Sequence, residues 1–249
     1  WNLHEEKFMS GLYPAVSHLN LKASYSLTAD RGPSTVTNSM AVISSNTPWR
    51  PFASVRESGL YIADLANQDL TYEKKHELNV GFEAGFIDNR INLVFDWYKR
   101  NNYDLIGVIS TQGVGGEMQK FGNIASMKSD GFEISLSTVN VKTRDFRWET
   151  NLIYSHARNE VTDLQTVERV IDLVSGNGFA QEGYPVRSIF SIPFMGLNEE
   201  GLPTFRDQEG NISVNGINFQ ESTPEKLKFL EYSGSADPTD VGSLGNIFK

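Results

Sequence analysis

The stretch "NRINLVFDWYKRNNYDL", residues 89–105, decides the fold of this chain. Apolar side chains occupy every second position, at Ile91, Leu93, Phe95 and Trp97, and the positions between them are mostly polar. Successive side chains of a β-strand point to opposite faces, so this period of two predicts a strand with one apolar and one wet face. The next question is whether the apolar face meets a protein core or lipid.

The same alternation recurs in other stretches of the chain. The connections between these predicted strands are alternately short and long. The other strands are expected in "HLNLKASYSLT" (18–28), "HELNVGFEAGF" (76–86), "GFEISLST" (131–138) and "FRWETNLIYSHARN" (146–159). Short turns at Asp88-Asn89 and Lys142-Thr143 are expected at one end of the strands, the periplasmic end. Long loops are expected at about 29–70, 102–129 and 160–185, with the segments near Trp49 and Gly115 at the other end. This rhythm is typical of up-and-down outer-membrane barrels, which have brief periplasmic turns and long extracellular loops.

The strand lengths agree with a membrane barrel. About ten residues suffice for a tilted strand to cross a bilayer. We therefore predict an all-β protein, an antiparallel up-and-down transmembrane β-barrel segment. The remainder predicts a weaker strand around "VRSIFSIPF", in which Pro193 indicates an edge, a bend or the strand's end, and a possible short helix in "STPEKLKFL".

Composition excludes several other classes. The chain has 249 residues and a mean hydropathy of -0.35, and no run of about 18 apolar residues predicts a membrane-spanning helix. The net charge of -9 argues against nucleic-acid binding, which needs basic surfaces. Cysteine is absent, which excludes thiol chemistry. Since the chain starts at Trp1 and stops in the alternating "GSLGNIFK", we expect an internal piece of a longer protein.

Several stretches resemble one family. "LTYEKKHELNVGFEAGFIDNRINLVFDWYKRNNYDLI" is similar to SusC/RagA-type TonB-dependent outer-membrane receptors, and "FGNIASMKSDGFEISLS", "RWETNLIYSHARNEVTDL" and "GSADPTDVGSLGNIFK" follow in that family's order. The positions that match the family's motifs are Leu70, Glu73, Lys74, Asp96, Tyr98, Lys99, Asp104 and Leu105. The chain departs from the family at Ser26, where glycine is usual, and at Asp240-Val241.

The resemblance implies a fold and a function. Residues 1–249 would form part of a plugged barrel of about 22 strands, supplying some six or seven from its later part, with the plug and the closing strands absent. Members of the family import glycan or peptide oligomers in Bacteroidetes-like bacteria. Each is paired with a SusD-like surface lipoprotein, and TonB supplies energy through the N-terminal part. The resemblance thus implies a bacterial outer-membrane nutrient importer that contacts lipid, not an enzyme and without a cofactor or nucleic acid.

Two sets of residues are candidates for contact with a substrate. Polar side chains of the strands are expected to face the lumen, where they either solvate the interior and pair with the plug or line the substrate path. This set comprises Asn79, Glu83, Asp96, Arg100, Glu133, Arg147 and Glu149. Aromatic residues assigned to loops could stack on sugar rings or peptide side chains. They are Trp49, Phe52, Tyr61 and Tyr103.

The pattern predicts no catalytic, cofactor or metal site. The four histidines, His4, His18, His76 and His156, lack metal-ligand spacing, and "DQEGN" at 207–211 lacks the regular acidic positions of a calcium loop. The alternative function is a soluble surface β-domain that binds carbohydrate or protein. Such a domain must bury its apolar faces, and we find no second apolar set to cover them.

Overall fold

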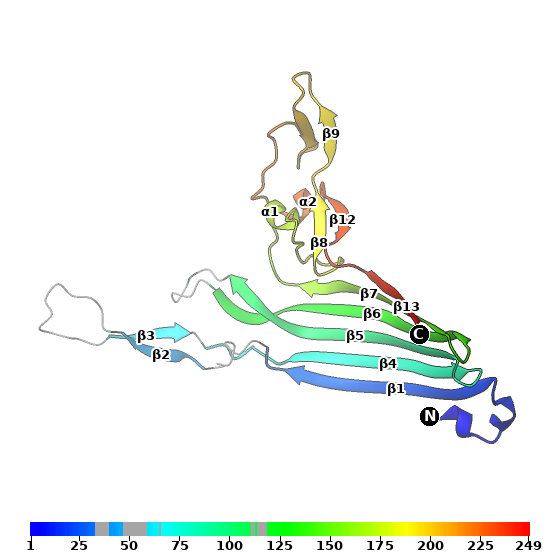
Figure 1. Ribbon diagram of the computed structural model, residues 1–249. Coiled ribbons are helices and arrows are strands. Elements are labelled where there is room, and N and C mark those ends of the chain that lie inside the picture. Colours follow the sequence, from blue (N-terminus) through cyan, green and yellow to red (C-terminus); the bar gives the residue numbers. More distant parts are fainter. Residues whose placement is uncertain (33–39, 47–58, 65, 111–112, 114–118) are drawn as a thin grey trace, which may run out of the picture.

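The computed structural model describes residues 1–32, 40–46, 59–64, 66–110, 113 and 119–249 (Figure 1). Its main element is a six-stranded antiparallel sheet in the order β1-β4-β5-β6-β7-β13. The bounds are β1 (Val16–Asp30), β4 (Glu73–Phe86), β5 (Ile91–Ser110), β6 (Gln119–Lys142), β7 (Arg147–Leu164) and β13 (Asp240–Phe248). The strands follow one another in space as they do in sequence, which is the up-and-down arrangement that the alternation predicts.

Tight turns join β4 to β5 and β6 to β7 at one end of this sheet, here called the turn end (Figure 1). In the first turn Ile87, Asp88 and Asn89 have φ of 53°, 55° and 57°. Aspartate and asparagine tolerate this left-handed region better than most residues. In the second, Thr143 donates its N–H to the carbonyl of Phe146 at 2.8 Å. The prediction that both turns lie at one end is confirmed.

The longer connections leave the sheet at the opposite end, here called the loop end. One contains a hairpin of β2 (Val42–Asn46) and β3 (Gly59–Asp64). Short 3₁₀ turns, η1 (Leu3–Glu5) and η2 (Ser10–Leu12), precede β1 near the turn end. Trp49 and Gly115, whose segments we expected at the loop end, lie outside the described residues.

The strands are longer than the alternation indicates. In place of a loop over 102–129, β5 continues to Ser110, which pairs with Gln119 at the start of β6. The pairing shifts between Asn102 and Leu105, and Asp104 has φ of 58°. A bulge of this kind interrupts the side-chain alternation while the backbone ladder resumes beyond it. The expected loop over 102–129 is therefore wrong for the parts that β5 and β6 occupy.

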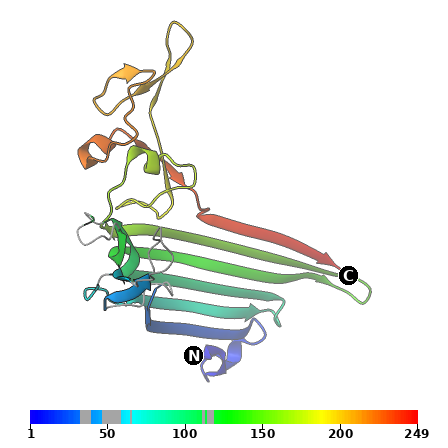
Figure 2. The same ribbon diagram turned by 90° about the vertical axis from the view of Figure 1, so that its left-hand side faces the viewer.

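A separate folded unit, residues 165–239, here called the module, joins β7 to β13 and stands off the loop end of the sheet (Figure 2). We expected a loop over 160–185, but β7 extends to Leu164 and a helix follows. The elements of the module are α1 (Val170–Leu173), β8 (Ser188–Ser191), β9 (Phe194–Leu197), β10 (Pro203–Arg206), β11 (Ile212–Ser213), α2 (Pro224–Leu227) and β12 (Glu231–Ser235). They form two small sheets, β12-β8 and β11-β10-β9.

The module has a hydrophobic core of its own. Val170, Leu173, Phe190 and Leu227 are buried together, at 0–6 % exposure. Of the alternatives expected at Pro193, the structure shows the strand's end, because β8 stops at Ser191. The predicted short helix is α2. Proline occupies its first position, where the fixed φ of proline suits the start of a helix. Within the described residues no helix is both long and apolar enough to pass through a membrane.

Candidate transport surface

Strand register divides the large sheet into an apolar face and a polar face. Phe82 lies opposite Leu21 and Phe95, Phe95 lies opposite Ile134, and Ile134 lies opposite Tyr154. Residues that are opposite each other in a ladder share a face, as do residues two apart in one strand. The predicted apolar set therefore lies on one face, as expected. It comprises Leu78, Val80, Phe82, Ile91, Leu93, Phe95, Ile134, Leu136 and Leu152.

Aromatic rings cross the apolar face from strand to strand. The centroids of Phe82 and Phe95 lie 5.5 Å apart, those of Phe95 and Phe132 6.1 Å, and those of Phe132 and Tyr154 5.8 Å. These spacings are in the range of favourable ring pairs. Nearer the turn end, Trp148 stacks on Phe248 at 5.8 Å. Trp148 and Phe248 lie near the strand ends, where the aromatic girdle of a membrane barrel is expected.

The apolar stretches of the central strands fit within a membrane band. On β4 the apolar alternation runs from Leu78 to Phe86 and on β5 from Ile91 to Trp97. At about 3.3 Å per residue these stretches are roughly 20 to 26 Å long, which for strands tilted by about 40° corresponds to roughly 15 to 20 Å of the apolar band of about 25 Å on outer-membrane barrels. Large apolar side chains remain exposed there, such as Val80 at 43 % and Leu244 at 68 %. The height and exposure of this face suit contact with lipid.

Charged side chains bound the apolar band toward the loop end. Lys99 lies opposite Asp130, which in turn lies opposite Arg158. The Arg158 Nε is 3.1 Å from Asp130 Oδ1, and in the next row Lys128 Nζ is 2.9 Å from Glu160 Oε1. The same face thus changes from apolar to charged within one row, as expected where a strand leaves hydrocarbon for an aqueous headgroup layer.

The polar face carries the predicted polar set. By register Asn79, Glu83, Asp96, Arg100, Glu133, Arg147 and Glu149 all lie opposite the apolar side of their strands. Ion pairs cross this face, with Lys22 Nζ 3.3 Å from Glu83 Oε2 and Arg100 Nε 3.2 Å from Glu77 Oε1. The Arg100 guanidinium also lies 4.3 Å from the ring centroid of Tyr98. The face is a hydrophilic surface with local charge compensation.

Two carboxylates are neighbours in the middle of the polar face. Asp96 lies directly opposite Glu133, and Gly81 opposite Asp96. The carboxylate of Asp96 occupies the space that a Cβ at position 81 would need. Among the residues that the structure describes, neither acid forms an ion pair. This position therefore presents negative charge to whatever the polar face encloses.

The structure separates the aromatic residues chosen as ligand contacts. Trp49 and Phe52 lie outside the described residues. Tyr61 is in β3 and 52 % exposed, whereas Tyr103 is in β5 of the large sheet. By register Tyr103 lies on the same side of β5 as Trp97, and its ring meets that of His76 edge-on at 5.4 Å. Tyr61 and Tyr103 therefore belong to different sheets, and Tyr103 lies in a strand instead of a loop.

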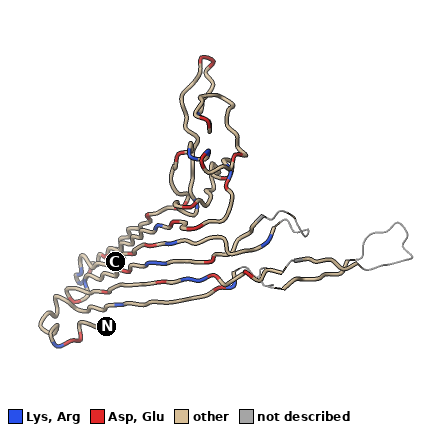
Figure 3. Tube along the Cα trace, turned by 180° about the vertical axis from the view of Figure 1, so that it is seen from behind, with Lys and Arg blue, Asp and Glu red and all other residues tan. Residues whose placement is uncertain are grey.

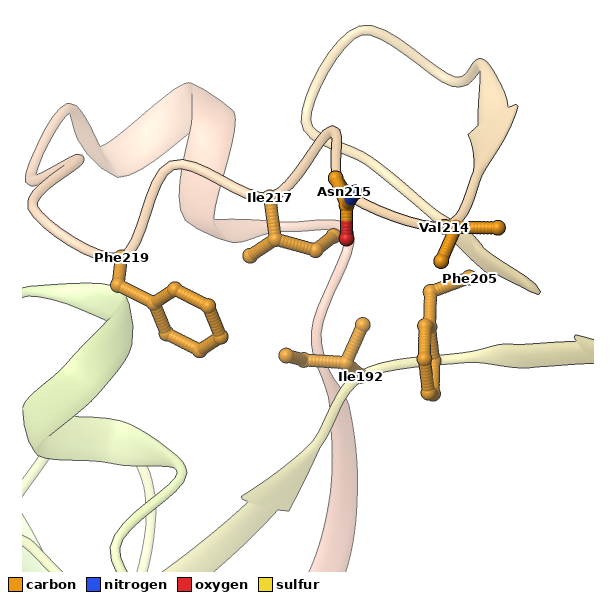
Figure 4. A pocket seen from close by; sticks show the side chains of 6 residues that line it. All are labelled: Ile192, Phe205, Val214, Asn215, Ile217 and Phe219. Carbon is orange, nitrogen blue, oxygen red and sulfur yellow. The ribbon is translucent and has the colours of Figure 1, made fainter. Parts of the chain in front are cut away.

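The module holds an apolar pocket that the period-two pattern does not reveal. It has a volume of about 260 Å³ and lies between β8, β10 and the segment after β11 (Figure 4). The side chains that line it are Ile192, Phe205, Val214, Asn215, Ile217 and Phe219. Beyond the pocket the β9-β10 turn carries Glu199 and Glu200, and the tip of the module is acidic (Figure 3). In the sequence, the only signal for this pocket is the clustering of isoleucine and phenylalanine in a turn-rich stretch.

Hydrogen bonds hold the polar edge of the module around α2. The carboxylate of Glu221 accepts the Thr223 hydroxyl at 2.6 Å and the Thr223 N–H at 3.0 Å, and Lys226 Nζ lies 3.4 Å away. These donors lower the pKa of Glu221 to about 2. Arg169 similarly donates to Asp172 at 2.8 Å and lowers the pKa of that carboxyl. The ionised carboxylates thus tie the two helices' ends in place.

Within the described residues no group of three or more histidine, aspartate or glutamate side chains is placed to hold a metal ion. The rings of His4 and His18 lie 6.4 Å apart. In the "DQEGN" stretch, Asp207 is 6 % exposed and its Oδ1 accepts the N–H groups of Glu209 and Asn211. This carboxylate therefore accepts hydrogen bonds from the backbone of its own turn.

Comparison with known proteins gives the same family along most of the chain. Residues 11–223 match the family model described as TonB dependent receptor-like, beta-barrel. The chain is 27 % identical over 223 residues to TonB-dependent receptor P26 of Formosa agariphila, covering 87 % of this chain and 21 % of that protein. It is 26 % identical over 167 residues to TonB-dependent receptor SusC of Bacteroides thetaiotaomicron, covering 66 % of this chain and 16 % of SusC.

Solved structures share the fold. The structure of the RagAB peptide transporter matches with a TM-score of 0.76 and 21 % identity, over 100 % of this chain and 26 % of that one. The RagAB peptide importer in its "closed-closed" state matches with a TM-score of 0.73 and 22 % identity, over 99 % of this chain. The chain spans between a sixth and a quarter of the length of the relatives it matches.

Proposed function

Because the chain belongs to the TonB-dependent receptor-like β-barrel family of outer-membrane proteins, we propose that it forms part of the barrel wall of a nutrient importer. The substrates that we propose are oligomers, either glycans or peptides. This family consists of receptors and transporters and is not a family of enzymes. The work of this segment is to enclose a path through the membrane.

The observation that carries the proposal is the division of the large sheet into two faces. In our proposal the apolar face with Leu93, Leu136 and Leu152 contacts lipid, and the face with Asp96 and Glu133 lines the lumen. A barrel strand in a membrane needs this alternation, because hydrocarbon solvates one side and water the other. A soluble β-domain would instead cover its apolar face, whereas Leu152 is 37 % and Val80 43 % exposed.

The charged residues of the predicted polar set fall into two groups, those with an ion-pair partner on the sheet and those without one. Glu83 and Arg100 have ion-pair partners on the wall itself, so we assign them to solvation of the interior. Asp96 and Glu133 have no ion-pair partner among the described residues, and we assign them to contact with a cationic group inside the barrel. The candidates for that group are a basic side chain of the plug or of the substrate.

The remaining parts of the importer would be supplied by partners and by the rest of the receptor. We propose that the loop end faces the cell exterior and a SusD-like surface lipoprotein, since the module and the longer connections project there. TonB would supply energy through the N-terminal part of the receptor. The relatives named as TonB-dependent receptors and the RagAB peptide transporter support this assignment.

The orientation of the wall is tested by labelling neighbouring positions. Because this chain lacks cysteine, Asn79→Cys and Val80→Cys place a thiol on opposite faces of β4. Both are introduced into the full-length receptor, with any cysteine elsewhere replaced. We expect a charged, water-soluble maleimide to label Asn79→Cys in intact outer membranes and to leave Val80→Cys unlabelled until detergent is added. The reverse result would refute the proposed orientation.

Transport itself is tested in cells. Uptake of fluorescent oligopeptides and oligosaccharides is compared between cells with the receptor, without it, and with the receptor but without TonB. We expect uptake of one class of oligomer only when both are present. Uptake that persists without TonB would contradict the proposed importer.

A further inference from the structure

The apolar face contains a hollow of about 590 Å³ across β1, β4 and β5. Its floor is made by small side chains, since Ala23 lies opposite Val80. Two tryptophan side chains flank this floor. Trp97 lies opposite Val80 on the β5 side of the hollow, and Trp1 lies on the β1 side. Trp1 shares this face because its backbone exchanges hydrogen bonds of 2.7 and 2.8 Å with Leu21. The result is an apolar recess between aromatic walls.

A lysine stands at the loop-end rim of this hollow. Lys99 follows Trp97 by two residues, so its side chain leaves the same face about 7 Å nearer the loop end. Lys99 is exposed and, among the residues that the structure describes, forms no ion pair, whereas Lys128 and Arg158 in the same charged zone are paired. A cation without an ion-pair partner among the described residues therefore lies where the apolar band ends, two residues from Trp97 of the hollow. It lies opposite Asp130, whose carboxylate is paired with Arg158.

We propose that the hollow and Lys99 bind a phosphorylated lipid of the outer leaflet, with an acyl chain between Trp1 and Trp97 and a phosphate at the Lys99 ammonium. The inference rests on the lipid-facing orientation of this face given under the proposed function. Lipid is the occupant that fits, because the hollow is continuous with the lipid-facing band and the cation lies at the level where headgroups begin. Tyr25 and His76 lie near Lys99 on the same face and are joined by a 3.1 Å hydrogen bond, so two further polar groups lie at this level beside Leu78.

Binding is measured on the purified full-length receptor after delipidation in detergent, by native mass spectrometry. The probes are monophosphoryl lipid A and the same lipid after enzymatic removal of its phosphate. The parent is expected to prefer the phosphorylated probe by about fivefold, the effect of one basic side chain near an anionic headgroup. Lys99→Gln should lose that preference, and Val80→Trp, which fills the hollow, should weaken binding of both probes.

Matched controls separate the site from general effects. Lys75→Gln removes a cation from the opposite face of β4, and Leu152→Trp adds a large ring to the apolar face on β7. Both should bind the two probes as the parent does. Folding is checked by heat-modifiable gel mobility, and Ala23→Leu replaces Val80→Trp if the latter does not fold.

Two results would overturn the lipid site: a phosphate preference that survives Lys99→Gln, or equal binding by the hollow-filling variant and the parent. The labelling of Asn79→Cys and Val80→Cys reports separately on the orientation of the wall. Failure of the lipid site with correct labelling would leave the proposed importer intact.

Discussion

Leu93 of β5 lies directly opposite Leu136 of β6 in the middle of the apolar face. Three residues along β5, on the other face, Asp96 lies opposite Glu133. Over three positions of one strand, the opposed residues change from an apolar pair on one face of the sheet to a pair of acids on the other face. It makes the faces separately testable by substitutions in one strand.

Leu93→Arg should lower the folded fraction of the full-length receptor in outer membranes. A guanidinium on the lipid side near the midplane costs roughly 2–4 kcal/mol in a barrel. The measurement is the folded fraction by heat-modifiable gel mobility. The control is Asp96→Asn, which keeps the other face polar and removes one of two opposed negative charges, so folding should stay within about 1 kcal/mol of the parent. Normal folding of Leu93→Arg together with loss of folding in Asp96→Asn would invert the two faces.

Gly131→Ala should destabilise the sheet on its polar face. A Cβ at this position would lie 2.6 Å from the Tyr98 Oη and 2.5 Å from the backbone oxygen of His156. The backbone contact cannot be relieved by a side-chain rotation, so we expect a cost of about 1–3 kcal/mol. Gly245→Ala is the control, since nothing lies within 4 Å of its Cβ position. The midpoint temperature of the mobility shift should fall for the first variant only; equal midpoints would refute the crowding.

Leu173→Ala should loosen the module without unfolding the sheet. Leu173 is 1 % exposed in the core with Val170, Phe190 and Leu227, and its truncation costs about 2–5 kcal/mol. Limited proteolysis of intact cells should cut residues 165–239 faster, while heat-modifiable mobility stays that of the parent. Ile171→Ala, at a position 45 % exposed, should leave proteolysis unchanged. Simultaneous loss of the barrel mobility would show that the module and the sheet do not fold separately.

Acid should weaken the α2 edge of the module through Glu221. The folded-state pKa of Glu221 is about 2 and its ordinary value is 4.5. A carboxyl whose pKa is lowered on folding contributes stability that is complete above the ordinary pKa and is lost as pH falls toward the folded value. Amide hydrogen exchange around Thr223 and Lys226 should therefore accelerate as pH falls from about 4.5 to about 2, after correction for the intrinsic exchange rate. In Glu221→Gln this acceleration should be absent; its persistence would assign the pH dependence to another group.

The sequence by itself determined the sheet and its two faces. Alternation over 91–97 and in the neighbouring strands specifies which side chains share a face, because in a ladder the side-chain period is two regardless of context. The turn at Asp88-Asn89 is equally local, since it depends on residues that tolerate positive φ. The polar set with Asp96 and Glu133 followed from the same rule, and the register places it on one face.

Tertiary structure alone decided how far the strands extend and what the longest connection becomes. β5 and β6 continue past the bulge at Asn102 and Leu105 because each supplies the other's backbone hydrogen bonds, and side-chain alternation does not encode this pairing between strands. Tyr103 for this reason lies in a strand. The core of the module brings Val170 beside Leu227, residues far apart in sequence. This cluster becomes buried only when the intervening chain folds back and brings these residues together. No local periodicity of the sequence predicts that contact.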